Sequence, residues 1–254
     1  MDPAVGRFTG VDPLSDRFSH VSSYNYAENE PIGHIDLWGL QKYYKENGAF
    51  FKSIGDDESI RILKPSSPFH KYFDFELKAN SVPAYPLNDK NEEAVMGTWA
   101  RKNRESNVEK SMSIFSHQIF HEDGNLAGTV FIVGSTGISH HDDKVDLESS
   151  KPPLGIKGWK RQAVVHNHPA PSVNAFSDAQ PMGDFGNHYG GDYWWGATRG
   201  LDLYLIVEGH NNMLKFDYDT FLGELKEADI STQDLGIYTI NKYGRYATRS
   251  IRIY

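Results

Sequence analysis

The chain has no cysteine among its 254 residues, which excludes disulfides, thiolate zinc ligands and cysteine nucleophiles. Any metal site must therefore be built from histidine, aspartate and glutamate. Long apolar runs are missing too, and none approaches the roughly 20 residues needed to cross a bilayer. The N-terminus lacks the basic and apolar regions of a signal peptide, so we expect another apparatus to carry the protein out of its cell.

Basic residues are scarce relative to acidic ones, with 26 Lys and Arg against 34 Asp and Glu and a formal net charge of -8. This balance disfavours nonspecific attraction to nucleic acid or to an anionic membrane, so we expect neither as a partner. What the chain does have is a 39% hydrophobic share and many aromatics, with 14 Tyr and 14 Phe. This composition is typical of a soluble, strand-rich globular protein.

Residues 1–40 have a texture of their own, in which short aromatic or apolar pairs alternate with Asp-Pro, Asn and Gly and no helical period is present. The pattern predicts tight turns between very short strands, too few to close a core. The ordered pieces are Asp2-Pro3, Gly6-Arg7-Phe8, Asp12-Pro13-Leu14, Tyr24-Asn25-Tyr26, Glu30-Pro31 and Asp36-Leu37-Trp38-Gly39-Leu40.

These pieces resemble the C-terminal end of the RHS-repeat-associated core of bacterial polymorphic toxins. The resemblance implies a secreted effector, delivered to a target cell by a specialised secretion system and countered by a cognate immunity protein. In this family a β-cocoon encloses a C-terminal toxin, and many members cleave themselves after the final leucine, here Leu40. Leu37 departs from the family pattern, because proline usually stands at that position.

The remainder of the chain alternates between helical and strand patterns. We expect a linker or irregular strands over 41–88, and one domain over 89–254. Within the domain the spacing predicts a helix over 89–105 and a hairpin of 111–120 with 126–133. Further strands are expected at 162–165, 201–208 and 214–218, and an edge strand in the tail 237–254. This order predicts an α/β (α+β) sandwich, a mixed sheet flanked by helices.

The compact cluster of metal-binding residue types is His166-Asn167-His168-Pro169. Two histidines separated by one residue on an extended strand point to the same side. Zinc accepts imidazole nitrogens and a carboxylate, and leaves a fourth place for water, which it ionises near neutral pH. A nearby carboxylate would then serve as the base that takes the proton of that water. The string therefore predicts a zinc site at a strand end.

This string resembles the signature of JAB/MPN-plus (JAMM) metallopeptidases, in which an upstream Glu precedes His-x-His-Pro, a loop and Ser-x-x-Asp. The resemblance implies a mixed sheet flanked by helices with cytidine-deaminase-like layering. It also implies a Zn²⁺ cofactor and cleavage of peptide or isopeptide bonds in a peptide or in a protein substrate, including ubiquitin-like ones. His166 and His168 carry over as zinc ligands.

The third ligand is open, because Gln180 stands where the signature has Asp. Asp178 is nearest to the usual distance from the second histidine, whereas Asp184 lies at about the usual distance before the next apolar strand. We favour Asp184, since loop length changes more readily than helix length. By resemblance, Ser177 would stabilise the oxyanion of the tetrahedral intermediate.

The upstream base should stand at the start of a strand that leads into a hairpin. Glu109 opens the segment 109–120 and is our candidate for the residue that deprotonates water. Glu105 is the alternative, and Glu122 has the position of a turn residue.

Two other functions fit parts of the sequence. His-Asn-His also resembles the HNH endonucleases, which makes a metal-dependent nuclease toxin the first alternative, although the acidic chain has no basic stripe. The second is a non-catalytic binding domain on a JAB-like scaffold, which the altered Ser-x-x-Asp spacing keeps open.

Overall fold

A ten-stranded mixed sheet organises the protein, in the strand order β12-β11-β10-β7-β5-β6-β4-β3-β1-β2. The computed structural model describes residues 41–54, 59–65, 74–138, 149–153, 156–168, 176–178, 180–181, 189–207 and 211–253. The expected RHS-like segment 1–40 lies outside these described residues. The result is a mixed α/β fold, as the sequence predicts.

The strands pair antiparallel except for β1 with β3 and β7 with β10, which are parallel. The sheet strands are β1 (Gln41–Tyr44), β2 (Phe50–Ile54), β3 (Ser59–Leu63), β4 (Ser81–Pro86), β5 (Lys110–Phe120), β6 (Leu126–Ile138), β7 (Lys160–His168), β10 (Asp202–Val207), β11 (Asn212–Phe216) and β12 (Thr248–Arg252). A separate two-stranded ladder joins β8 (Gln180–Pro181) to β9 (Tyr189–Gly190).

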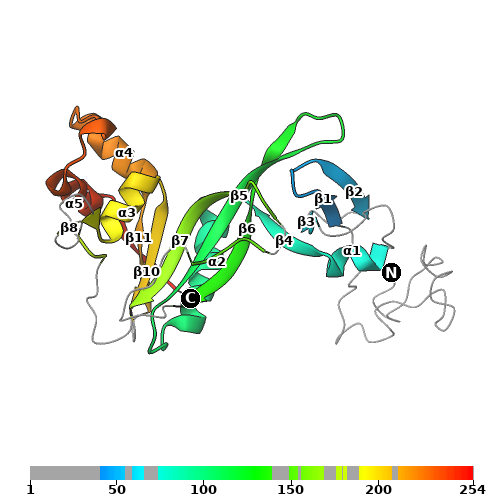
Figure 1. Cartoon of the computed structure of the whole chain (residues 1–254), viewed down its shortest axis with the longest axis horizontal. Helices are drawn as coiled ribbons and strands as arrows, with labels where there is room; N and C mark the ends of the chain where they lie inside the picture. Colours follow the sequence, from blue (N-terminus) through cyan, green and yellow to red (C-terminus); the bar gives the residue numbers. More distant parts are fainter. Residues whose placement is uncertain are drawn as a thin grey trace, which may run out of the picture.

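Helices cover the sheet on both faces. They are α1 (Asp74–Ala79), α2 (Asp89–Asn103), α3 (Asp192–Arg199), α4 (Tyr218–Glu227) and α5 (Ile237–Tyr246), with the short 3-10 helix η4 (Thr232–Asp234) between the last two. Figure 1 shows α3, α4 and α5 gathered at one end of the sheet, while β1–β3 and α1 lie at the other. None of the helices in the described ranges is long and apolar enough to span a membrane.

The two faces of the central strands build two different cores. Val164 of β7 and Leu205 of β10 pack with the buried residues of α3, α4 and α5. Their neighbours Val165 and Ile206 instead pack with Met96 and the other buried residues of α2. Because successive side chains of a strand point to opposite faces, the parity of each residue decides which helical layer it meets. This end of the molecule is therefore a three-layer sandwich.

Helix α2 begins at the predicted residue, Asp89, and ends two residues before the predicted end. The side chain of Asn88 caps the first turn by accepting a hydrogen bond from the backbone N–H of Asn91 at 2.9 Å. Acidic residues occupy the first turn and basic residues the last, as the helix dipole favours. The expected helix over 89–105 is thus confirmed, with its end at Asn103.

The expected hairpin and strands are confirmed as well, as β5 with β6, β7, β10 and β11. The tail does contain the expected edge strand, β12, but helix α5 precedes it. Residues 41–88 form strands β1–β4 and helix α1, and β4 pairs with β6. The sheet therefore continues across the boundary that we placed at residue 88.

Beneath α2 the core contains a buried charge, that of Lys215, whose side chain is 0% exposed. Its Nζ lies 2.9 Å from Asp202 Oδ2, 3.1 Å from Asp217 Oδ2 and 3.1 Å from Asp89 Oδ1. An ammonium group removed from water is tolerated only with such partners. The cluster joins β11, β10, α2 and the start of α4 at the edge of the sheet.

Glu92 of α2 extends this network, since it is buried and accepts a hydrogen bond of 2.7 Å from the hydroxyl of Tyr204. Burial raises the pKa of Glu92 from 4.5 to about 7, although the bond from Tyr204 opposes the rise. A carboxyl whose pKa is higher in the folded than in the unfolded chain favours folding while it is protonated. That contribution is complete below about pH 4.5 and is lost as pH rises through about 7.

We predict that Glu92→Gln flattens the pH dependence of stability. The amide stays neutral and can keep the bond from Tyr204, so the free energy of unfolding at pH ~8 should rise relative to wild type by up to about 3 kcal/mol. Urea unfolding at pH ~5 and ~8 measures the effect. Glu93→Gln is the matched control, because Glu93 lies on the same helix but pairs with Arg249 nearer the surface. Equal pH profiles for wild type and Glu92→Gln would contradict the prediction.

Candidate metal centre

Strand β7 ends in the two histidines that the sequence singles out. His166 and His168 lie on the same face of the strand, with ring centroids 5.0 Å apart. Because β7 lies between β5 and β10 in the middle of the sheet, the histidines stand at a central strand end. The side chain of His166 is 1% exposed and that of His168 16% exposed, so the pair leads from the core toward solvent.

Glu109 directly precedes β5, the antiparallel neighbour of β7. The register pairs Ser111 with His166, and two residues further along it brings Glu109 beside His168. The ligand atoms of Glu109, His166 and His168 all lie within 4.8 Å of one another, so these residues form a group that could hold a metal ion. The structure thus brings together the predicted base and the two predicted ligands.

The alternative bases lie elsewhere. Glu105 is largely exposed and pairs with Arg104. Glu122 is exposed in the turn between β5 and β6, as the sequence predicts.

Asp192, which the sequence analysis did not select, completes the centre. It is the first residue of α3 and is 8% exposed. Its Oδ1 lies 3.4 Å from His166 Nε2, and its Oδ2 lies 4.0 Å from His168 Nε2. Helix α3 lies in the chain between the parallel strands β7 and β10, so its N-terminus meets the carboxyl end of β7. The connection β7–α3–β10 therefore delivers a carboxylate to the histidines.

Ser177 fixes this carboxylate. Its backbone N–H and its hydroxyl both donate to Asp192 Oδ2, at 2.8 and 2.9 Å. In return, the backbone N–H of Asp192 donates to Ser177 Oγ at 2.8 Å, and that of Tyr193 donates to the Ser177 carbonyl at 3.3 Å. Gly191, at the N-cap of α3, has no side chain to cap the helix, so Ser177 caps it from another segment. The hydroxyl proton is directed at Asp192 here, and the oxyanion role of Ser177 stays a prediction.

Asp192 and His166 shift each other's pKa values. Burial by itself would raise the pKa of Asp192, but the charge of His166 and the hydrogen bonds from Ser177 outweigh it and lower that pKa to about 2. Burial would lower the pKa of His166, and the negative charges of Asp192 and Glu109 raise it overall. The Asp192 carboxylate is therefore ionised at neutral pH, and it lies beside the imidazoles.

His166 also supplies the test of whether a metal fits. Both of its ring nitrogens are buried and make no hydrogen bond within the part of the chain that the structure describes. The 3.4 Å separation from Asp192 is an ion-pair distance, longer than a good hydrogen bond. A buried polar atom left in this state costs free energy, and a metal ion satisfies it. The residues present could hold a metal ion.

Of the two predicted third ligands, Asp178 is the one within the described residues. Asp178 is exposed and forms an ion pair with Arg245 of α5, and it is Asp192 that lies beside the imidazoles. Asp184 lies outside the described residues.

Sequence spacing alone did not point to Asp192. Ser177 and its acidic partner Asp192 are 15 residues apart, whereas the signature places them three apart. Strands β8 and β9 lie between Ser177 and Asp192 in the chain and pair antiparallel. This pairing reverses the direction of the chain and brings Asp192 back to Ser177. One signal was available: Asp192 opens a short helical stretch that ends at Gly200, immediately before the apolar strand β10.

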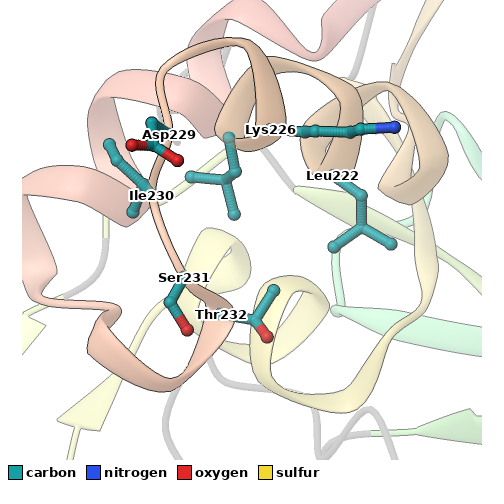
Figure 2. A pocket seen from close by; sticks show the side chains of 7 residues that line it. Leu222, Lys226, Asp229, Ile230, Ser231 and Thr232 are labelled. Carbon is teal, nitrogen blue, oxygen red and sulfur yellow. The ribbon is translucent and has the colours of Figure 1, made fainter.

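A surface pocket of about 340 Å³ lies apart from this centre in the chain. Figure 2 shows that its wall comes from α4 and the segment that follows it. The lining residues are Leu222, Leu225, Lys226, Asp229, Ile230, Ser231 and Thr232. None of them belongs to the metal centre, and no histidine is among them.

We predict that Asp192→Asn weakens zinc binding by more than about two orders of magnitude. Replacing a residue that only hydrogen-bonds to a metal ligand already costs about 10–100-fold in affinity. Asp178→Asn is the matched control and should bind like wild type, because its carboxylate faces Arg245. Titration with Zn²⁺, followed by calorimetry and by metal analysis of dialysed protein, gives both affinities. Equal affinities for the two variants would show that Asp192 is no ligand.

Comparisons with known proteins add no assignment to this geometry: no family model, curated protein or solved structure matches the chain.

Proposed function

We propose that this chain is a zinc-dependent peptidase or isopeptidase whose centre is arranged as in the JAB/MPN-plus family. The observation that carries the proposal is the convergence of Glu109, His166 and His168 within 4.8 Å, with Asp192 held against the histidines. A histidine pair, a locked aspartate and a separate glutamate are the parts that a metal-assisted hydrolase needs.

In this proposal His166, His168 and Asp192 would hold the zinc ion. A zinc ion so held supplies Lewis acidity and makes water ionise near neutral pH. Ser177 keeps Asp192 in place through its paired hydrogen bonds, which makes it a positioning residue. Burial of His166 fixes the inner side of the centre, while the partly exposed His168 faces the side from which a substrate would enter.

Glu109 is the general base of the proposed reaction. It stands beside the histidines, directly before the neighbouring strand β5. Its carboxylate takes a proton from the attacking water, and the same group then returns the proton to the amine that leaves as the peptide or isopeptide bond breaks.

The biological setting we propose comes from the resemblance of residues 1–40 to the end of an RHS core. In that setting the domain is the toxin of an effector delivered to a competing cell, and an immunity protein protects the producer. The substrate is a peptide or a protein of the target cell, including ubiquitin-like conjugates. The formal net charge of -8 supports a protein substrate over a nucleic acid.

The test compares Glu109→Gln with the control Glu105→Gln. Glu109→Gln should retain about one equivalent of zinc and lose cleavage by about 10²–10⁴-fold, the usual contribution of a general base. Glu105→Gln should cleave like wild type, because Glu105 is exposed and pairs with Arg104. Cleavage is followed by mass spectrometry of new N-termini in a bacterial lysate and in ubiquitin C-terminal fusions.

The same proteins are expressed in bacterial cells to measure toxicity, which Glu109→Gln should relieve and Glu105→Gln should not. A plasmid-nicking assay runs in parallel. Nicking by wild type that is lost in His166→Ala would overturn the peptidase in favour of a nuclease. Zinc binding without cleavage of any substrate in either assay would favour a non-catalytic domain.

A further inference from the structure

Asn167, the residue between the two histidines, faces away from them. It is 1% exposed and points to the opposite face of β7, toward the segment that follows α2. Its Oδ1 accepts a hydrogen bond from the backbone N–H of Lys110 at 2.8 Å. Its Nδ2 donates to the carbonyl of Val108 at 3.1 Å and to that of Ser106 at 3.4 Å. The groups of Val108 and Lys110 stand immediately before and after Glu109, and that of Ser106 lies three residues before it.

The segment that bears Glu109 lies outside the regular hydrogen bonding of helix and strand. Residues 104–109 lie between α2 and β5 and belong to neither helix nor strand. The ladder between β5 and β7 runs only as far as the pair Ser111 and His166. The side chain of Asn167 therefore continues the ladder where the backbones stop pairing, by presenting an acceptor and a donor like those of a peptide group.

We propose that Asn167 is a positioning residue that fixes Glu109 opposite the two imidazoles, an inference that rests on the proposed function of this centre. Successive side chains of a strand point to opposite faces. Three consecutive residues of β7 can therefore both present the imidazoles and hold the segment that bears Glu109. The outer two present imidazoles to the metal side, and the middle one holds the base segment from behind. Distances between base and ligands are thereby set by one short piece of chain.

The amide is suited to this role and smaller or apolar residues are not. Leucine shares the branching of asparagine at Cγ but neither donates nor accepts, so it removes the side-chain acceptor of the Lys110 N–H and the amide donor to the carbonyl of Val108. Serine is too short to reach from β7 to both groups. Both substitutions leave His166 and His168 on their own face of the strand, so the ligand set stays intact.

The experiment uses the full chain with Asn167→Leu and Asn167→Ser, and Asn91→Leu as the matched control. Asn91 is also a side-chain donor to a backbone carbonyl, that of Pro86 at 2.9 Å, and it lies at the opposite end of α2 from the segment that bears Glu109. The first readout is amide hydrogen exchange at Lys110 in metal-free protein. It should be faster by roughly tenfold in both Asn167 variants and unchanged in the control.

The second readout is metal binding, which should stay at about one equivalent of zinc, with an unaltered Co²⁺ spectrum, because the ligands are untouched. The third is cleavage, in which kcat should fall by roughly 10–100-fold with little change in KM. In Asn167→Leu combined with Glu109→Gln, the further loss relative to Glu109→Gln alone should vanish, because Asn167 acts through Glu109.

The possible failures are distinguishable. Unchanged exchange at Lys110 in either Asn167 variant overturns the positioning role, whatever the enzyme assays show. Loss of zinc from a folded Asn167 variant also overturns it, since the residue would then act on the ligands. If wild type cleaves nothing, the proposed function fails, while the exchange measurement still decides whether Asn167 holds the segment. Asn167→Ser provides the answer if Asn167→Leu does not fold.

Discussion

The alternation of side chains along the last residues of β7 is the constraint on which the centre depends. Because successive residues of a strand face opposite sides, His166 and His168 point toward α3 and Asn167 toward the segment after α2. A shift of one residue in the pairing of β7 would exchange these faces and dismantle the site. The register is held on both sides, by β5 and by β10, in the best-packed part of the sheet.

The second requirement is a carboxylate that stays ionised in a buried place. Taking Asp192 out of water is costly, and the structure offsets the cost with two donors from Ser177 and with the imidazole of His166. The position of Asp192 at the start of α3 adds the favourable end of the helix dipole. A carboxylate held in this way is ready for a cation without any rearrangement, which is how a metal centre gains affinity.

A different solution to the same problem appears at the edge of the sheet. Lys215 is fully buried among carboxylates from three other segments, and Tyr204 and Glu92 extend the network beneath α2. Here a lysine occupies the space between the acids, so the cluster serves packing and not ligand binding. The two clusters share β10 as a neighbour, but the one at the carboxyl end of β7 contains His166, whose ring nitrogens make no hydrogen bond within the described residues.

The sequence by itself determined the features that depend on local pattern: the helix over 89–105, the hairpin of β5 and β6, the strands β7, β10 and β11, and the choice of His166, His168 and Glu109. Each follows from periodicity or from neighbouring residues. The acidic partner depends on the tertiary structure, because Asp192 meets Ser177 across a sequence separation of 15 residues that includes the β8–β9 ladder. The tertiary structure also decided the role of Asn167, since which backbone a buried amide meets depends on the strand that pairs alongside, and no local spacing encodes that neighbour.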